Sequence, residues 1–311
     1  MAQLVSHRGL AGSRFVFGAM QFGDGADAKA SREMFDACRA AGITHFDTAW
    51  IYTDGASERL LGALAKAERD DLIIASKVGC TGGAGAANMQ AQFDQSRQRL
   101  GMDVVDLLYL HRFDPDTDLR ETMGCFAQLR EAGRIRYVGV SNFAAWQVMK
   151  AQAIAATFGL SIDVVQPMYN LVKRQAEVEL LPMCADQDMT VAAYSPLGGG
   201  LLTGKYASGG TGRLDRDARY GARYRLGWMH DAARALSAIA SELGTEAATL
   251  AVAWVARHPT APHPIVSARS AAQLNPSLDA LSFDMGEALY ARISALSPAP
   301  PPATDRLEEQ T

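Results

Sequence analysis

Four polar side chains stand near the ends of three apolar runs, where together they could protonate a carbonyl oxygen. In chain order they are Asp47, Tyr52, Lys77 and His111. A tyrosine has a pKa near ~10 and is a weak acid at neutral pH, but a neighbouring cation such as Lys77 stabilises the phenolate and lowers that pKa. Asp47 could pair with Lys77, and His111 could donate a second hydrogen bond to the same oxygen. These residue types predict a proton donor for carbonyl reduction.

Each of the four residues also has a purely structural interpretation. Asp47 could cap a loop and Tyr52 could be a surface aromatic. Lys77 could extend to water, and His111 could be a hydrogen-bonded core histidine. Their joint placement at the ends of neighbouring strands favours function, because strand order would bring them together at one face. No serine or cysteine nucleophile with an adjacent base is evident, and no pair of carboxylates with separate roles stands out.

The elements that must position these residues are short apolar or β-branched runs that alternate with amphipathic stretches. The predicted strands are 14–20, 43–50, 71–79, 103–111, 135–142, 163–170, 190–197 and 263–269. The predicted helices include 31–42, 93–101, 121–133, 175–187, 231–243 and 245–257. Gly42, Gly101 and Gly133 follow three of these helices, at the position where glycine commonly ends a helix.

Nearly continuous apolar strands that alternate with helices indicate a buried parallel sheet in an α/β protein. A doubly wound sheet and a closed barrel both fit this pattern, and the count of eight favours a single (β/α)₈ TIM barrel over residues 1–311. We expect a short N-terminal hairpin, a long connection after the seventh strand (198–262) and a loosely ordered tail at 296–311. In such a barrel, chemistry gathers at the C-terminal ends of the strands.

Composition excludes several classes of function. The chain has 311 residues, a net charge of −4 and a pI of about 5.9, so it lacks the basic footprint of a nucleic-acid-binding protein. No apolar run approaches the ~18 residues of a membrane span, and no signal peptide is evident, so we expect a cytoplasmic protein. Four widely spaced cysteines without a CxxC motif predict neither a disulfide framework nor a metal site.

One basic cluster interrupts this charge balance. Residues 213–225 contain five arginines and two aspartates. We interpret the segment as a solvated loop, with a lid over an anionic cofactor or substrate as the alternative.

Two glycine-rich stretches resemble nucleotide-binding motifs. In YSPLGGGLLTGKY (194–206), Gly199, Gly204 and Lys205 have the GxxxxGK spacing of a P-loop, but Tyr206 stands where a Mg²⁺-binding serine or threonine should follow. Consecutive glycines could still turn backbone N–H groups toward a phosphate. In GGAGAAN (82–88), the third glycine of the Rossmann fingerprint would fall on Asn88, so we interpret this stretch as a loop at the active-site rim.

Several segments together resemble the aldo-keto reductase family, in particular its bacterial and channel-β-subunit-like branches. The segments are FDTAWIYTDGASERLLGAL (46–64), SKVG, LLYLHR, GVSN (139–142), VVQPMYN (164–170), YSPLGGGLLTGKY and PIVSARSAAQL (264–274). The resemblance covers nearly the whole chain and implies a (β/α)₈ barrel that reduces aldehydes and ketones with NADPH. It implies Tyr52 as general acid, Lys77 and Asp47 as its tuning pair, and His111 as the residue that orients the carbonyl.

The resemblance also implies the cofactor contacts. The implied residues are Ser141, Asn142 and Gln166 at the carboxamide, Tyr194 stacked on the nicotinamide, Ser195, Pro196, Leu197, Gly200, Leu202 and Lys205 around the pyrophosphate, and Arg269, Ser270 and Gln273 at the adenosine phosphate. Ser141 and Asn142 could instead cap the following helix, and Arg269 could cap or salt-bridge the start of the eighth helix. The chain departs from the family where Ser267 replaces a common glycine, and where Pro276 and Ser277 replace a Glu-Asn pair that holds the adenine.

A second function on the same barrel is a redox-sensing partner subunit that binds the cofactor and turns over slowly. The enzyme interpretation, with a small-molecule carbonyl compound as substrate, is the leading one. Trp50, Phe113, Tyr169 and Trp228 could line the substrate pocket or pack in the core. The sequence leaves oligomerisation open.

Overall fold

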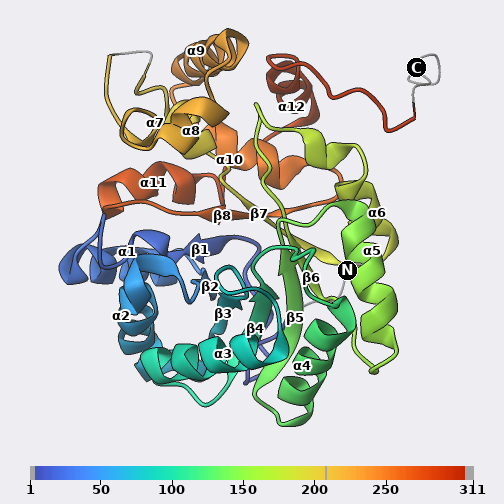
Figure 1. Cartoon of the computed structure of the whole chain (residues 1–311). Helices are drawn as coiled ribbons and strands as arrows, with labels where there is room; N and C mark the ends of the chain where they lie inside the picture. Colours follow the sequence, from blue (N-terminus) through green and yellow to red (C-terminus); the bar gives the residue numbers. More distant parts are fainter. Residues whose placement is uncertain (1–3, 207–208, 305–311) are drawn as a thin grey trace.

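Eight parallel strands close into a barrel in the computed structural model, which describes residues 4–206 and 209–304 (Figure 1). Neighbours in sequence are neighbours in the sheet, and β8 pairs with β1 to close it. The strands are β1 Val16–Gly18, β2 His45–Asp47, β3 Ile73–Val78, β4 Val105–Leu110, β5 Ile135–Ser141, β6 Val164–Gln166, β7 Thr190–Tyr194 and β8 His263–Val266. Each lies within a strand predicted from the sequence, so the (β/α)₈ prediction is confirmed.

The strands are buried on both faces because alternate side chains point into the barrel and out toward the helices. Val16, Ala75 and Tyr109 belong to one cluster, which fills the barrel interior. Phe46 and Leu108, on the other face, belong to the larger cluster packed under the helices. This alternation explains why the strands contain almost no exposed residue and read as continuous apolar runs.

Helices surround the barrel, and the six that the sequence predicts end within two residues of their predicted ends. They are α1 Ala28–Ala40, α2 Ala56–Ala65, α3 Ala86–Leu100, α4 Leu119–Glu131, α5 Ala145–Ala156, α6 Leu180–Asp186, α7 Arg213–Arg216, α8 Ala218–Arg223, α9 Gly227–Glu242, α10 Ala247–Arg257, α11 Ala271–Asp279 and α12 Glu287–Ser294. Gly101 ends α3 with φ +65°, and Gly42 and Gly133 also have positive φ just after α1 and α4. These left-handed positions are the ones that favour glycine at a helix C-terminus.

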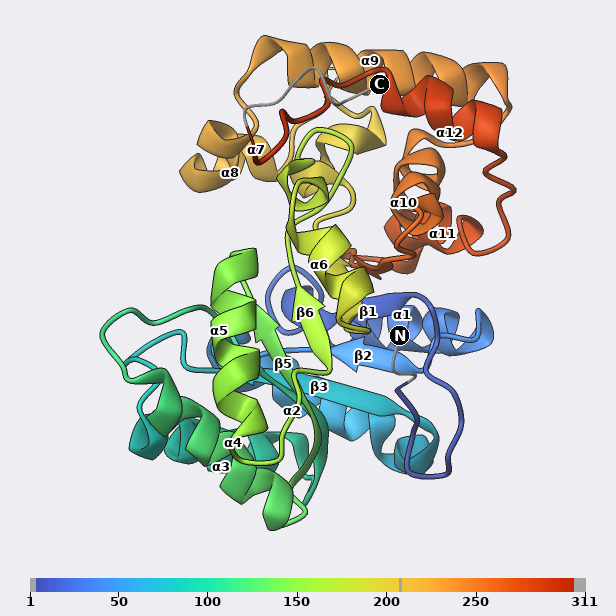
Figure 2. The ribbon, with the colours of Figure 1, turned by 90° about the vertical axis from the view of Figure 1, so that its right-hand side faces the viewer.

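The long connection after β7 is more ordered than expected. The Arg-rich segment 213–225 was expected to be a solvated loop, but most of it forms the short helices α7 and α8. The Asp217 side chain accepts a hydrogen bond from the Arg219 N–H at the start of α8, which a charge count does not reveal. Figure 2 shows these helices beside α9, at the same end of the molecule as α12, and Arg292 of α12 pairs with Glu242 of α9 at 2.7 Å.

The N-terminal segment packs against the start of the barrel. An antiparallel bridge between Val5 and Ala11 forms the predicted hairpin. The Val5 N–H donates to the Tyr137 hydroxyl at 3.0 Å, and Leu4 joins the interior cluster. The hairpin therefore covers the end of the barrel opposite the predicted site.

The predicted tail, 296–311, lies partly outside the described residues. At its start the Ser297 side chain is buried, and Arg174 donates to the Ser297 carbonyl at 3.4 Å.

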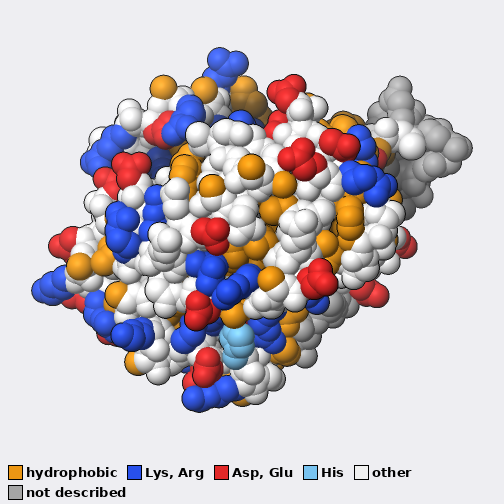
Figure 3. All heavy atoms as spheres, turned by 60° about the horizontal axis from the view of Figure 1, so that its bottom comes forward, with side chains coloured by type: hydrophobic (Ala, Val, Ile, Leu, Met, Phe, Trp, Pro, Cys, Tyr) orange, Lys and Arg blue, Asp and Glu red, His pale blue; other side chains and the backbone are white. Residues whose placement is uncertain are grey.

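Across the face in Figure 3, basic and acidic side chains lie side by side. Within the described residues, no helix combines the length and hydrophobicity needed to cross a bilayer.

Candidate active site

A buried lysine and aspartate form the centre of the site. Lys77 near the end of β3 donates to Asp47 at the end of β2 and to the Thr48 carbonyl at 2.7 Å. Both side chains face the barrel interior, because Lys77 stands two residues after the inward-facing Ala75 and Asp47 pairs with Ala75 across the sheet. The pair lies among apolar side chains, where an unpaired charge would be strongly unfavourable. The predicted Asp47–Lys77 pair is therefore present.

A buried amide on β6 holds the other oxygen of this aspartate. The Gln166 side-chain N–H donates to Asp47 Oδ2 at 3.0 Å, and the Ser141 hydroxyl lies 3.3 Å from the Gln166 amide oxygen. Both carboxylate oxygens of Asp47 thus accept hydrogen bonds, one from Lys77 and one from Gln166. These bonds hold the Asp47 side chain in one orientation beside Lys77. Burial raises the pKa of Asp47, and the Lys77 charge and hydrogen bonds from Lys77 and Gln166 oppose this rise.

The Tyr52 phenol lies over this pair. The Lys77 ammonium is 5.1 Å from the centre of the Tyr52 ring. Burial opposes the charge on Lys77, but Asp47 and Tyr52 raise the pKa of Lys77 above its ordinary value, so it is an ammonium at neutral pH. Lys77 lowers the pKa of Tyr52, as predicted, but burial is the larger effect and the net pKa is raised. Tyr52 is therefore fully protonated at neutral pH, as a proton donor must be.

His111 completes the group at the end of β4. Its ring meets the Tyr52 ring edge-on, with centroids 5.9 Å apart and an interplanar angle of 84°. Burial, Lys77 and Arg112 lower the pKa of His111 to about 3, so the imidazole is neutral at physiological pH. The buried Nδ1 of His111 has no hydrogen-bond partner among the described residues. A neutral imidazole can donate one hydrogen bond, which suits an uncharged carbonyl oxygen.

The structure therefore brings all four predicted catalytic side chains together. Two neighbours were not recognised in the sequence. Tyr109 stands two residues before His111, and Lys77 lies 5.7 Å from its ring centre; period-2 alternation along the strand could have identified it. Tyr220 of α8 is among the groups that raise the pKa of Tyr52, although about 170 residues of chain separate them, and no short-range pattern predicts this approach.

Asn142 and Tyr194 form a polar surface beside the four. The Tyr194 hydroxyl donates to the Asn142 amide oxygen at 2.7 Å, and the Asn142 amide donates to the His111 carbonyl at 2.9 Å. Asn142 has φ +59°, a left-handed conformation that asparagine tolerates better than most residues. The alternative interpretation of Ser141 and Asn142 as the cap of α5 is wrong, because the N-cap residue of that helix is Ala144.

The segment after β7 turns its backbone tightly. Gly198, Gly199 and Gly200 all have positive φ inside the 3₁₀ segment Gly198–Thr203. A Cβ on Gly200 would lie 2.9 Å from the Lys205 ammonium, so the absence of a side chain lets this cation lie over the backbone. Ser195 also has positive φ, Pro196 is buried and Leu197 is partly buried.

Leu202 and Tyr206 limit what this segment can do. The Leu202 side chain is fully buried, so only its backbone is placed to meet a ligand. Tyr206 accepts a hydrogen bond from the Leu214 N–H at 3.0 Å, and the next helix among the described residues begins at Arg213. A P-loop places its lysine at the start of a helix, so the GxxxxGK match is coincidental.

The segment after β8 places a further cation nearby. Burial, Arg269 and Arg216 lower the pKa of Lys205, so these three cations lie in one region. No carboxylate among the described residues pairs with Arg269. The Ser270 hydroxyl accepts from the Gln273 N–H at 3.4 Å and caps α11.

Ser277 and Tyr169 are not available at a surface. Ser277 is buried and its hydroxyl has no partner among the described residues, while Thr249 donates to the Pro276 carbonyl at 2.7 Å. Tyr169, a candidate for the substrate pocket, is fully buried against Trp254, with ring centroids 5.3 Å apart. Its role is packing in the core.

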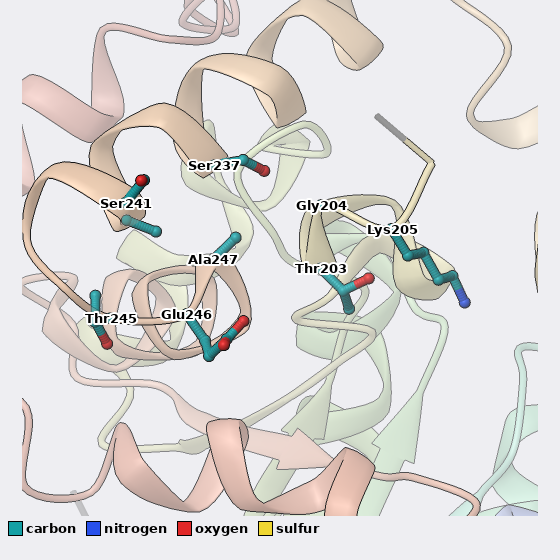
Figure 4. Close-up of a pocket in the computed structure, with 9 residues that line it drawn as sticks. Thr203, Gly204, Lys205, Ser237, Ser241, Thr245, Glu246 and Ala247 are labelled. Carbon is teal, nitrogen blue, oxygen red and sulfur yellow. The ribbon is translucent and has the colours of Figure 1, made fainter. Parts of the chain in front are cut away.

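A pocket of about 410 Å³ lies beside the glycine-rich segment after β7 (Figure 4). It is lined by Thr203, Gly204, Lys205, Ser237, Ala240, Ser241, Thr245, Glu246 and Ala247. In Figure 4 the Lys205 side chain extends away from the helix residues on the other side of the pocket. None of the four central residues lines it, so it is separate from the Tyr52 group.

Comparison with known proteins identifies relatives along most of the chain. A model of the Aldo/keto reductase family matches residues 14–298. The chain is 33% identical over 293 residues to a protein named "Probable voltage-gated potassium channel subunit beta" from Oryza sativa subsp. japonica, covering 88% of each chain. It is 31% identical over 314 residues to "Uncharacterized oxidoreductase YrpG" from Bacillus subtilis, covering 94% of each.

A third relative matches a shorter part of the chain. The chain is 38% identical over 197 residues to "Aflatoxin B1 aldehyde reductase member 2" from Rattus norvegicus, covering 61% of this chain and 54% of the relative. Together, the family match and the names of these relatives support oxidoreductase chemistry on carbonyl compounds.

Proposed function

The chain belongs to the aldo/keto reductase family, and we propose that it catalyses the NADPH-dependent reduction of an aldehyde or ketone to the alcohol, with Tyr52 as the general acid. The observation that carries this proposal is the convergence of Tyr52, Lys77 and His111, with Lys77 held by Asp47 inside the barrel. A phenol, an ammonium and a neutral imidazole in contact form a site that can protonate a carbonyl oxygen as negative charge develops on it.

The proton comes from Tyr52. Its phenol donates to the carbonyl oxygen, and the Lys77 ammonium, 5.1 Å from the ring centre, stabilises the phenolate that remains. Asp47 and the Thr48 carbonyl hold the ammonium in place. The phenolate then regains a proton from solvent. A bound nicotinamide cofactor supplies the hydride for the carbonyl carbon.

His111 orients the substrate and takes no proton. Its pKa of about 3 keeps the ring neutral at physiological pH, so it donates one hydrogen bond to the carbonyl oxygen. This bond fixes the oxygen between the imidazole and the Tyr52 hydroxyl, and proton transfer needs such an alignment.

The residues around the barrel mouth fit a dinucleotide cofactor. Tyr194 offers an aromatic face, and its hydroxyl is tied to Asn142, so both can meet a nicotinamide carboxamide. Gly198, Gly199 and Gly200 expose backbone for the phosphates, and Lys205 adds a positive charge beside them.

We propose NADPH rather than NADH because of Arg269. The two cofactors differ by a 2′-phosphate, and a guanidinium binds phosphate through paired hydrogen bonds. Arg269 lies in the same region as Lys205 and Arg216, which also contains Asp215, and among the described residues Arg269 forms no ion pair. Buried Ser277 offers no group to the adenine, so the cofactor contacts rest more heavily on the phosphate end.

Initial rates of NADPH oxidation with a panel of aldehydes and ketones test the proposed function. We expect repeated turnover with at least one carbonyl compound and a slower rate with NADH. Oxidation limited to a single equivalent of bound cofactor would favour the alternative function, a redox-sensing partner subunit. A role as a partner subunit is suggested by the name of the rice relative.

A further inference from the structure

The backbone immediately after Tyr52 adopts an unusual conformation. Thr53 has φ +47° and ψ +43°, Asp54 has φ +49° and ψ +39°, and Gly55 has φ +79°. Two consecutive residues with side chains in the left-handed region are uncommon, and such a segment persists only where its surroundings hold it. The Thr53 hydroxyl donates to the Phe22 carbonyl at 2.8 Å, which secures one point of the loop.

Arg99, near the end of α3, contacts the same loop from outside the barrel. Its Nη1 donates to the Trp50 carbonyl at 2.8 Å, two residues before Tyr52. Its side chain lies directly against Gly55, where a Cβ would be 2.5 Å from Nε and 2.6 Å from Cζ. The guanidinium therefore touches the loop on both sides of the proton donor.

The same Nη1 lies 3.3 Å from Oε2 of Glu58, in the first turn of α2. Glu58 is fully buried, and its other oxygen accepts from the Ser76 hydroxyl at 2.7 Å. Ser76 directly precedes Lys77 on β3. A buried carboxylate is stable only when both oxygens are hydrogen-bonded, so this contact fixes α2 to the strand that carries the ammonium.

We propose that Arg99 and Glu58 are positioning residues that hold the Tyr52 loop in register with Lys77. Neither touches the reacting atoms. Arg99 contacts the Tyr52 loop at the Trp50 carbonyl and at Gly55, and it also contacts Glu58. Glu58 in turn binds Ser76, so the loop that carries the phenol is linked to the strand that carries the ammonium. The inference rests on the proposed function, because the register of Tyr52 and Lys77 matters only if Tyr52 donates a proton.

Arg97 provides a matched control on the same helix. Its side chain is 19% exposed, against 21% for Arg99. It donates to the Asp103 carbonyl at 2.8 Å and to the Asp103 carboxylate at 2.9 Å, in the turn before β4. Arg97→Met thus removes a similarly exposed arginine from the same helix, but the bonds it removes are local to the turn before β4 and leave the Tyr52 loop untouched.

The test compares Arg99→Met, Arg99→Lys, Glu58→Gln and Arg97→Met with wild type. We expect Arg99→Met to lower kcat on the order of 10²-fold, as a small misplacement of a catalytic group can. The Kd for NADPH should not change, and the solvent deuterium isotope effect on kcat should rise because proton transfer becomes slower. Arg99→Lys retains a cation and should recover part of the rate, while Arg97→Met should behave as wild type.

Hydrogen exchange across residues 50–57 gives a readout that does not depend on activity. Arg99→Met should exchange faster there than wild type, and Arg97→Met should not. If the wild type turns over no substrate but Arg99→Met still exchanges faster across residues 50–57, the proposed function is contradicted and the positioning of the loop by Arg99 is not. Kinetics and exchange of Arg99→Met that match those of Arg97→Met would overturn the positioning role. If Arg99→Met does not fold, Arg99→Lys and Glu58→Gln decide the question by the same measurements.

Discussion

At the scale of single residues, Lys77 is the buried cation that interacts with both Asp47 and Tyr52. Its ammonium is buried between Asp47 and the Tyr52 ring, and both neighbours raise its pKa. The charge therefore persists at neutral pH although the surroundings are apolar. It opposes the effect of burial on the pKa of Tyr52 without reversing it, so the pKa of the phenol stays above its ordinary value.

Replacing this cation should slow proton transfer. Lys77→Met keeps the length of the side chain and removes the charge, so the Tyr52 phenolate loses its partner. We expect kcat for carbonyl reduction to fall by about 10²–10⁴ at pH 7. Steady-state kinetics measure this, with a thermal melt as the control because Asp47 loses its donor. Wild-type kcat in a folded Lys77→Met protein would contradict the proposed role.

Arg269 should determine cofactor choice. A charged hydrogen bond to phosphate is worth roughly 1.5–3 kcal/mol, so Arg269→Ala should raise the Kd for NADPH about tenfold to a hundredfold. The Kd for NADH, which lacks the 2′-phosphate, should hardly change. Fluorescence quenching at fixed salt measures both constants. Equal affinity of the wild type for the two cofactors would refute the assignment.

At the scale of elements, the turn after β7 depends on glycine. Gly200 has φ +96°, and a Cβ there would lie 2.9 Å from the Lys205 ammonium. Gly200→Ala should shift this turn and displace the cation. A left-handed alanine costs about 1–3 kcal/mol, and we expect the Kd for NADPH to rise about tenfold.

Gly227→Ala, at the start of α9, serves as the control for this substitution. No atom lies within 4 Å of a Cβ built there, and its φ is not positive. Isothermal titration with NADPH should therefore give the wild-type Kd for this variant. The same Kd for Gly200→Ala would show that the turn does not contribute to cofactor binding.

The elements also show which parts of the structure the sequence predicts. Strand positions follow from apolar runs, and the convergence of Asp47, Lys77 and His111 follows from the count of eight strands. The helical structure of 213–225 was missed because its side-chain caps and its packing against Gly199 are not visible in a charge pattern. The bonds from Arg99 to Trp50 and Glu58 were missed because they join separate βα units.

At the scale of the whole molecule, buried histidines make stability depend on pH. His45 lies inside the barrel, where burial, His263 and Lys77 lower its pKa to about 3. Its unfolded pKa is about 6.5, so the unfolded chain binds more protons below that pH. Stability is therefore complete above about pH 6.5 and is lost progressively as the pH falls toward the folded value.

Urea denaturation at pH 7 and pH 5 measures this effect. The lowering of the His45 pKa from about 6.5 in the unfolded chain to about 3 in the folded protein should make the free energy of unfolding about 2 kcal/mol smaller at pH 5 than at pH 7. His45→Gln cannot titrate, so its loss of stability over the same interval should be smaller by about that amount. The same pH dependence in wild type and variant would contradict the assignment of a neutral buried His45.

The proposed reduction chemistry depends on Tyr52 as the general acid, and Tyr52→Phe tests this proposal most directly. The variant keeps the ring over Lys77 and removes only the proton donor. Tyr137→Phe, which removes another inward-facing phenol at the opposite end of the barrel, is the matched control. We predict that Tyr52→Phe loses carbonyl reduction by about 10²–10⁴ in kcat while its Kd for NADPH stays that of wild type, and that Tyr137→Phe remains active. A folded Tyr52→Phe protein that retains more than about a tenth of wild-type kcat would contradict the account.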